Sequence, residues 1–176
     1  MWCAHCVHLD DGDVGKLAAT GTGAAHCPTS NLRLGAGVAP VRPLLDAGGR
    51  VGLGVDGSAS NERADLSLEV KQALLLARAR DGPGAMTARE ALRLATRGGA
   101  AVLARDDLGS LEPGKCADFA VWDPNATVFS GADDPVAALV FGGPQRVSRL
   151  VVGGEEVAFD EEEILREHRK QAARFL

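Results

Sequence analysis

Short apolar runs alternate with amphipathic segments from the start of the chain to about residue 104. The apolar runs predict three strands, near residues 2–7, 22–26 and 51–55. The segments after them predict three helices, near residues 11–20, 39–47 and 66–80. Because strands and helices alternate, we expect an α/β fold in which the three strands are parallel and adjacent, with the helices packed outside.

Helix boundary signals support these segments. Asp10 or Asp11 can cap the first helix, and Gly21 can end it. The stretch TAREALRLATRGGAAVLA predicts a further pair of helices, in which Thr87 and Glu90 have the spacing of a capping box.

The pattern changes after Gly109. ADFAVWD, PVAALVFGG and VSRLVVGGEEVAF read as short strands, so residues from about 117 to 158 are expected to form a small separate sheet. DEEEILREHRKQAARFL has acidic residues first and basic residues last, which suits a helix and its dipole. We therefore expect three segments, covering residues 1–108, 109–159 and 160–176.

Composition excludes several classes of protein. With 45% hydrophobic and 24% charged residues, the chain is expected to be globular and not disordered. The net charge of −5 and the lack of a Lys/Arg stripe argue against nucleic-acid binding. No apolar run approaches the roughly 18 residues of a membrane span, and no signal peptide is recognisable. A cytoplasmic protein whose four cysteines are free thiols is therefore expected.

The opening MWCAHCVHLDD holds a CxxC motif at Cys3 and Cys6. A zinc knuckle needs a second ligand pair, and the nearby His26 and Cys27 are adjacent, which suits two corners of a tetrahedron poorly. A thioredoxin-type motif should follow a strand, whereas this one lies inside the apolar run. Packing of both cysteines in a buried strand is the favoured interpretation.

Three chemically capable residues, His5, His26 and Asp56, lie at the ends of the three predicted strands. In a (β/α)8 barrel the carboxyl ends of the strands form the active-site face. We therefore expect all three side chains at the same end of the sheet, with His5 and Asp56 in one pocket.

The stretches WCAHCVHLDD, AHCPTSNLRLGAGVAPV and VGLGVDGSASN, in this order, resemble strands six to eight of an amidohydrolase-superfamily barrel. LGSLEPGKCADFAVWD is similar to the segment with which these enzymes return to a small β sandwich. The resemblance implies the C-terminal part of a metal-dependent-hydrolase TIM barrel, a small β-sandwich segment and a C-terminal helix. Within the superfamily the chain looks most like the 8-oxoguanine deaminases, which implies conversion of 8-oxoguanine to urate and ammonia.

The same resemblance implies roles for individual residues. Asp56 matches the strand-eight aspartate, a ligand of one divalent metal, zinc, that also shuttles a proton. His5 matches the strand-six histidine that orients the attacking water. His26 lines the pocket or holds the CPTSN loop in place, while Ser58 and Asn61 contact the purine-like substrate or build the turn.

The chain also departs from the superfamily pattern. The strand-one His-x-His pair, the strand-five histidine and the glutamate that follows it have no counterpart, so we expect an N-terminally truncated fragment that is inactive alone. Deaminases or hydrolases of guanine, isoxanthopterin or a triazine remain alternatives. A non-catalytic α/β fragment or binding module is a further alternative, and the full-length enzyme could form a homo-oligomer.

Overall fold

Three short parallel strands organise the first part of the molecule. The computed structural model describes residues 1–123, 125, 127–143 and 146–175. Strands β1 (Trp2–Ala4), β2 (Gly23–His26) and β3 (Val51–Leu53) form a sheet in the order β1-β2-β3, and both pairings are parallel. The predicted adjacent, parallel arrangement is therefore confirmed.

A helix follows each strand, as the pattern predicts. The helices are α1 (Asp11–Thr20), α3 (Val41–Asp46) and α4 (Leu66–Asp81). Asp10 caps α1 by accepting a hydrogen bond from the Asp13 amide, and Asp65 caps α4 in the same way. A short additional helix, α2 (Pro28–Arg33), was not predicted; it begins with Pro28 directly after β2.

One continuous helical run replaces the predicted pair of helices. It comprises α5 (Ala88–Arg93), a π-helical turn η1 (Leu94–Gly98) and α6 (Gly99–Val102). The predicted capping box at Thr87 and Glu90 is confirmed. The run crosses β3 closely: a Cβ at Gly98 would overlap the Val51 carbonyl oxygen, and one at Gly52 would lie 2.9 Å from the Gly99 backbone. Glycines thus allow the run to contact the sheet backbone directly.

A second sheet is separate from the first. Strands β4 (Phe119–Val121), β5 (Arg149–Val152) and β6 (Glu155–Glu156) pair antiparallel in that order, which confirms the expected small sheet. The prediction of a strand at PVAALVFGG is wrong, because these residues form helix α7 (Pro135–Gly142). Asp134 accepts from the Val136 and Ala137 amides and Pro135 occupies the first turn, and together they start a helix. A 3₁₀ turn, η2 (Thr127–Phe129), lies between β4 and α7.

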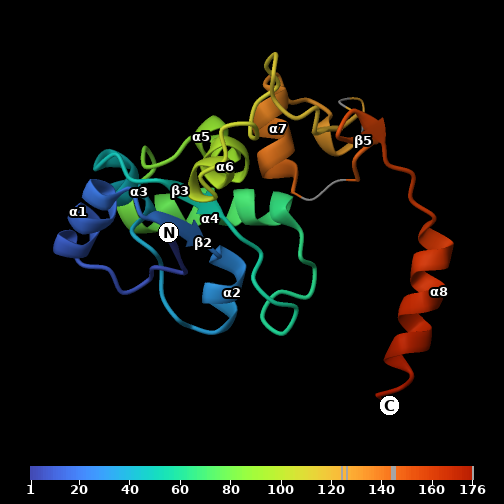
Figure 1. Cartoon of the computed structure of the whole chain (residues 1–176), viewed down its shortest axis with the longest axis horizontal. Helices are drawn as coiled ribbons and strands as arrows, with labels where there is room; N and C mark the ends of the chain where they lie inside the picture. Colours follow the sequence, from blue (N-terminus) through green and yellow to red (C-terminus); the bar gives the residue numbers. More distant parts are fainter. Residues whose placement is uncertain (124, 126, 144–145, 176) are drawn as a thin grey trace.

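The core lies between the first sheet and its helices, whereas the last helix stands apart. The most buried large side chains include Leu44, Leu74 and Met86. Helix α8 (Glu161–Ala172) extends away from the other elements in Figure 1. No helix in the described ranges is long and apolar enough to cross a membrane.

Candidate active site

His5 directly follows β1, and Asp56 is the third residue after β3, so both lie beyond the carboxyl ends of strands in the same sheet. His5 continues the pairing of β1, because its amide donates to the Ala25 carbonyl at 2.9 Å. Both residues leave the extended conformation, with φ of 66° at His5 and 63° at Asp56. His5 is therefore the first residue after its strand and not part of it, which corrects the longer predicted strand. Non-glycine residues in this conformation carry strain and are concentrated at functional sites.

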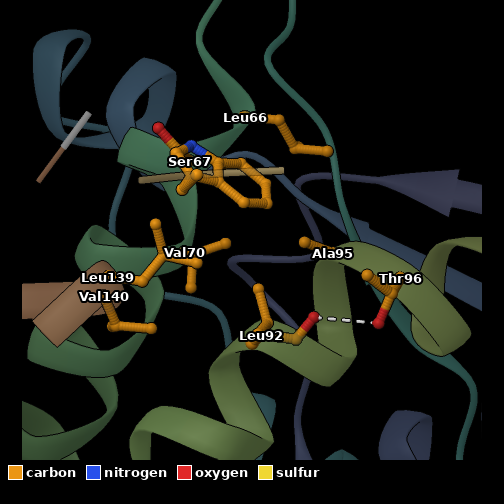
Figure 2. A pocket seen from close by; sticks show the side chains of 9 residues that line it. Leu66, Ser67, Val70, Leu92, Ala95, Thr96, Leu139 and Val140 are labelled. Carbon is orange, nitrogen blue, oxygen red and sulfur yellow. Dashed lines mark hydrogen bonds between the residues drawn. The ribbon is translucent and has the colours of Figure 1, made fainter. Parts of the chain in front are cut away.

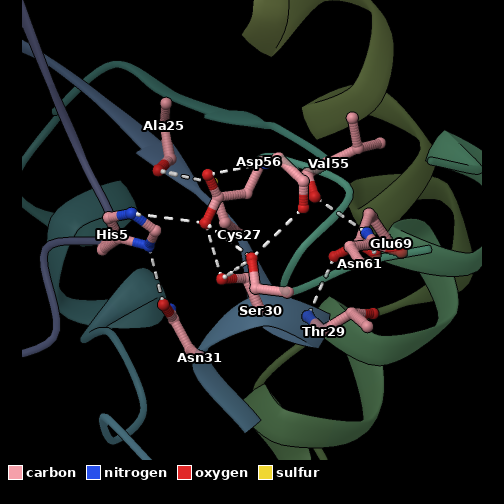
Figure 3. A network of polar contacts seen from close by, with 12 residues as sticks. His5, Ala25, Cys27, Thr29, Ser30, Asn31, Val55, Asp56, Asn61 and Glu69 are labelled. Carbon is pink, nitrogen blue, oxygen red and sulfur yellow. Dashed lines mark hydrogen bonds and ion pairs between the residues drawn. The ribbon is translucent and has the colours of Figure 1, made fainter. Parts of the chain in front are cut away.

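The two side chains meet at this end of the sheet, as predicted. His5 Nε2 lies 3.7 Å from Asp56 Oδ2, and about a third of each side chain is exposed (Figure 3). Residues far apart in the sequence therefore form one solvent-accessible site.

A set of hydrogen bond donors holds the Asp56 carboxylate. Ser30 Oγ donates to Oδ2 at 2.6 Å, Ser60 Oγ lies 3.2 Å from the same oxygen, and the Gly57 amide donates to Oδ1 at 2.8 Å. The Ser30 hydroxyl, followed by the Gly57 amide, lowers the pKa of Asp56 below its ordinary value. Asp56 is thus an oriented carboxylate that is ionised at neutral pH.

The other face of the site is formed by Asn31. Its Oδ1 lies 2.8 Å from His5 Nδ1, on the opposite side of the ring from Asp56. Asn31 is only 1% exposed, so its side chain is enclosed by the fold while the His5 ring reaches solvent.

A buried carboxylate, Glu69 of α4, ties the loops around the site together. Glu69 is 0% exposed and accepts from the Thr29 amide at 3.0 Å and from Asn61 Nδ2 at 2.9 Å. Asn61 Nδ2 also donates to the Val55 carbonyl, just before Asp56. Glu69 therefore links α4, α2 and the turn that carries Asp56.

His26 and Cys27 lie beneath the site. Burial, and secondarily the His5 ring, lowers the pKa of His26 to about 4, so its ring is neutral at pH 7. Its Nδ1 is buried and has no hydrogen bond partner among the described residues. Burial and the Asp56 charge raise the pKa of Cys27 to about 11, which keeps its thiol protonated.

The remaining candidates are placed less centrally. Asn61 is 2% exposed and its amide is engaged by Val55 and Glu69, which supports the turn-building alternative. Ser58 is exposed in the turn after Asp56. All four cysteines are free, as expected. Cys3 is exposed, as are the other two residues of β1. The interpretation of Cys3 as a buried packing residue is therefore wrong.

Sequence reasoning missed three contributors to the site. Ser30, Asn31 and Glu69 contact Asp56, His5 and the surrounding loops respectively. The polar stretch TSN directly after a strand end was a usable signal for the first two. Glu69 gave none, because a glutamate in a helix is ordinarily exposed.

The described residues do not by themselves form a metal centre. Among them no three His, Cys, Asp or Glu side chains gather closely enough to hold an ion. Asp56 is a suitable single ligand, with His5 beside it, whereas a catalytic zinc ordinarily takes three protein ligands. The donor set that the described residues supply is thus incomplete for zinc.

A separate pocket of about 170 Å³ lies between α4, the α5–η1 run and α7 (Figure 2). Apolar side chains such as Val70, Leu92 and Leu139 form most of its wall. The Thr96 hydroxyl donates a hydrogen bond to the Leu92 carbonyl. None of the described residues that line the pocket is titratable, so their side chains offer no acid–base chemistry.

Comparison with known proteins gives a consistent result. Residues 1–157 match the model described as the amidohydrolase family. An 8-oxoguanine deaminase of Pseudomonas aeruginosa is 47% identical over 138 residues, which cover 78% of this chain and 31% of that protein. A 5-methylthioadenosine/S-adenosylhomocysteine deaminase of Pelotomaculum thermopropionicum is 42% identical, covering 98% of this chain and 42% of that protein.

A solved structure agrees with these relatives. The atrazine chlorohydrolase TrzN of Arthrobacter aurescens TC1, complexed with zinc, has a TM-score of 0.88 and 38% identity. The match covers 94% of this chain and 39% of that one. The chain therefore spans about a third to two-fifths of the length of the proteins it matches.

Proposed function

Since the chain belongs to the amidohydrolase family, we propose that it forms part of an aminohydrolase that acts on an oxidised purine. The proposed reaction joins 8-oxoguanine and water to give urate and ammonia: the C–O bond forms, the exocyclic C–N bond breaks, and the amine leaves protonated. The 47% identity to an 8-oxoguanine deaminase supports this substrate.

One observation carries the proposal: His5 and Asp56 meet at the carboxyl end of a parallel sheet, 3.7 Å apart. Asp56 is ionised at neutral pH, so it can accept a proton from the attacking water. His5 lies close enough to orient the same water beside the ring carbon. The two residues thus supply the acid–base part of a hydrolytic deamination.

We propose Asp56 as one ligand of a divalent metal, by the similarity to a zinc-bound chlorohydrolase. When bound, zinc would lower the pKa of a coordinated water to about 7. The other ligands are proposed to come from parts of the relatives that this chain does not span, because the described residues lack a complete set.

The remaining candidates receive different proposed roles. Ser58 is exposed two residues after Asp56, and we propose that it contacts substrate. His26 and Asn61 are almost fully buried, and we propose that they support the loops instead of touching substrate.

A chimera tests the proposal. The chimera joins the N-terminal part of the Pseudomonas aeruginosa 8-oxoguanine deaminase, up to the segment that aligns with β1, to this chain. We expect it to form urate from 8-oxoguanine in the presence of zinc, measured by ultraviolet absorbance. Asp56→Asn should lower turnover by roughly 10²–10⁴-fold, as for loss of a general base. His26→Asn should be milder.

The exposed Asp133 gives a matched control, since Asp133→Asn removes the same charge away from the site. Turnover by Asp56→Asn equal to that of Asp133→Asn would refute the assigned role.

A second candidate substrate class follows from the relative that covers 98% of this chain, a 5-methylthioadenosine/S-adenosylhomocysteine deaminase. The same chimera offered 5-methylthioadenosine would release ammonia if this class is right. Because the N-terminal donor supplies part of the substrate site, the ratio of kcat/KM for the two substrates is compared with that of a second chimera built on the Pelotomaculum thermopropionicum deaminase. The substrate that both chimeras prefer is the one favoured by this chain.

A further inference from the structure

Asn31 and Ser30, neighbours in α2, contact the two residues of the proposed site from below. Ser30 Oγ donates to Asp56, while Asn31 Oδ1 lies 2.8 Å from His5 Nδ1. Consecutive helical residues point about 100° apart, so one short helix can reach both strand ends, as Figure 3 shows. The position of α2 is thus coupled to both side chains.

We propose that Asn31 is a positioning residue that keeps His5 in the tautomer with its proton on Nδ1. His5 Nε2 then faces Asp56 as a hydrogen bond acceptor. This inference rests on the proposed function, because it assigns to His5 the form in which it would act on water.

The chemistry of the contact carries the first step. An amide oxygen is only an acceptor, so a 2.8 Å contact with Oδ1 requires a proton on Nδ1. Asn31 is held firmly, since it is 1% exposed and both of its backbone groups are bonded. Its backbone N–H donates to the Cys27 carbonyl, and its backbone carbonyl accepts from the Ala36 N–H. The backbone of Asn31 is therefore held in place, and its enclosed side chain presents Oδ1 to the more exposed His5 ring.

The Asp56 side of the ring supports the same tautomer. If Nε2 carried a proton, it would face an ionised carboxylate, and two partly exposed side chains would close to about 2.7–2.9 Å. The observed separation is 3.7 Å, longer than a hydrogen bond. Two acceptors facing each other at this distance instead suit a shared donor.

A rotation of the amide would not improve the hydrogen bonding. In the present orientation Asn31 Nδ2 is buried without a partner among the described residues. With the amide turned by 180°, Nδ2 would contact His5 and Oδ1 would be buried in its place. One amide atom is unsatisfied in either case, so the Asp56 distance favours the present orientation.

A water molecule can donate to both Nε2 and Asp56 Oδ2, which are the two acceptors presented to solvent. By fixing the tautomer, Asn31 would make His5 Nε2 accept a hydrogen bond from the attacking water. Nε2 would then not donate to the Asp56 carboxylate in place of that water. The attacking water would be oriented by two acceptors that follow the first and the third strand of the sheet.

Nuclear magnetic resonance tests the tautomer in the 176-residue chain without any turnover. Two-bond ¹H–¹⁵N correlations of the ¹⁵N-labelled protein distinguish protonated from unprotonated ring nitrogens. The spectrum is recorded near pH 9, above the ordinary histidine pKa of about 6.5. Comparison with His5→Gln identifies the signals of His5 among the four histidines.

We expect Nδ1 of His5 to be protonated and Nε2 to be unprotonated in the unmodified chain. Asn31→Leu, similar in size but without an acceptor, should shift the ring toward the Nε2-protonated tautomer. Asn31→Asp keeps an acceptor and should retain the Nδ1 proton. Asn125→Leu makes the same change at an exposed amide that bonds to Asp123 and not to His5, and should leave the tautomer unchanged.

A protonated Nε2 in the unmodified chain would overturn the inference, even if Asn31→Leu does not fold. An unchanged Nδ1-protonated ring in a folded Asn31→Leu variant would overturn it as well, with folding checked by circular dichroism. The proposed function fails separately, if the chimera deaminates neither substrate while the His5 tautomer is as expected.

Discussion

At the scale of single residues, function and strain coincide at His5 and Asp56. Both have left-handed backbone conformations that cost a non-glycine residue on the order of 1–3 kcal/mol. The hydrogen bonds of the parallel sheet continue to His5, whose backbone N–H donates to the Ala25 carbonyl. The chain leaves the extended conformation at this residue, whose side chain faces the site. His26, one strand along, is enclosed and neutral instead.

The burial of His26 predicts a pH-dependent stability. The folded pKa of about 4 lies below the ordinary 6.5, so between these values the unfolded chain binds a proton that the folded chain does not. Stability should therefore fall as pH drops from about 6.5 to 4, by on the order of 3 kcal/mol from this residue.

Urea unfolding across this pH range measures the effect. His26→Gln should show a shallower loss than the unmodified chain, because it cannot take up the proton. His168→Gln, at an exposed position in α8, should follow the unmodified curve. Parallel curves for the unmodified chain and His26→Gln would contradict the prediction.

At the scale of elements, the position of the site depends on how the helices meet the sheet. The α5–η1–α6 run crosses β3 at a pair of glycines, and α4 holds the Asp56 turn through Glu69. The π-helical turn lies at this crossing, where its extra residue lets Gly98 approach the Val51 carbonyl. Close backbone contact therefore adds to the side-chain packing of Val51 in holding β3 here.

Gly98→Ala should therefore destabilise the chain. Its methyl group would overlap the Val51 carbonyl oxygen, which is backbone and cannot rotate away. We expect the free energy of unfolding to fall by about 1–3 kcal/mol, as for other overpacked sites, measured by chemical denaturation.

Gly15→Ala is the matched control, because it adds the same methyl group in α1 with nothing within 4 Å. It should be stabilising by about 0.5–1 kcal/mol, since alanine favours a helix. Equal effects at the two positions would show that the close crossing is unimportant.

At the scale of the whole molecule, the described residues form only part of a metal-dependent active site, the part around His5 and Asp56. All three β1 residues are exposed, although parallel strands are ordinarily covered on both faces. The chain spans 31% of one relative and 42% of another. Among the described residues, no three His, Cys, Asp or Glu side chains around Asp56 and His5 are arranged to hold a metal ion.

The 176-residue chain should accordingly bind zinc weakly and form no detectable urate alone. Loss of an outer-sphere partner at a metal site costs about 10–100-fold in affinity, and missing ligands should cost more. We expect titration calorimetry to show zinc binding more than roughly 100-fold weaker than in the chimera. Clear turnover by the chain alone would show that a complete metal site exists within it.

The sequence by itself determined the alternation of strands and helices up to about residue 104, the parallel pairing of the first sheet, and the presence of a separate small sheet after it. It also determined that His5, His26 and Asp56 lie at one end of the first sheet. Strands joined through helices run parallel, so their carboxyl ends lie at the same edge. These features depend on local hydrophobic pattern and on general rules for connecting strands, and both can be applied to a single sequence.

Only the tertiary structure decided which residues support the site. Helix α7 is a different case, because its start at Asp134 and Pro135 is a local signal that the sequence carries, although its apolar run has no period that separates helix from strand. The contacts of Asn31 with His5, Ser30 with Asp56 and Glu69 with Asn61 join residues that are 8 to 26 positions apart. Such contacts depend on how α2 and α4 pack against the sheet, which no local pattern encodes.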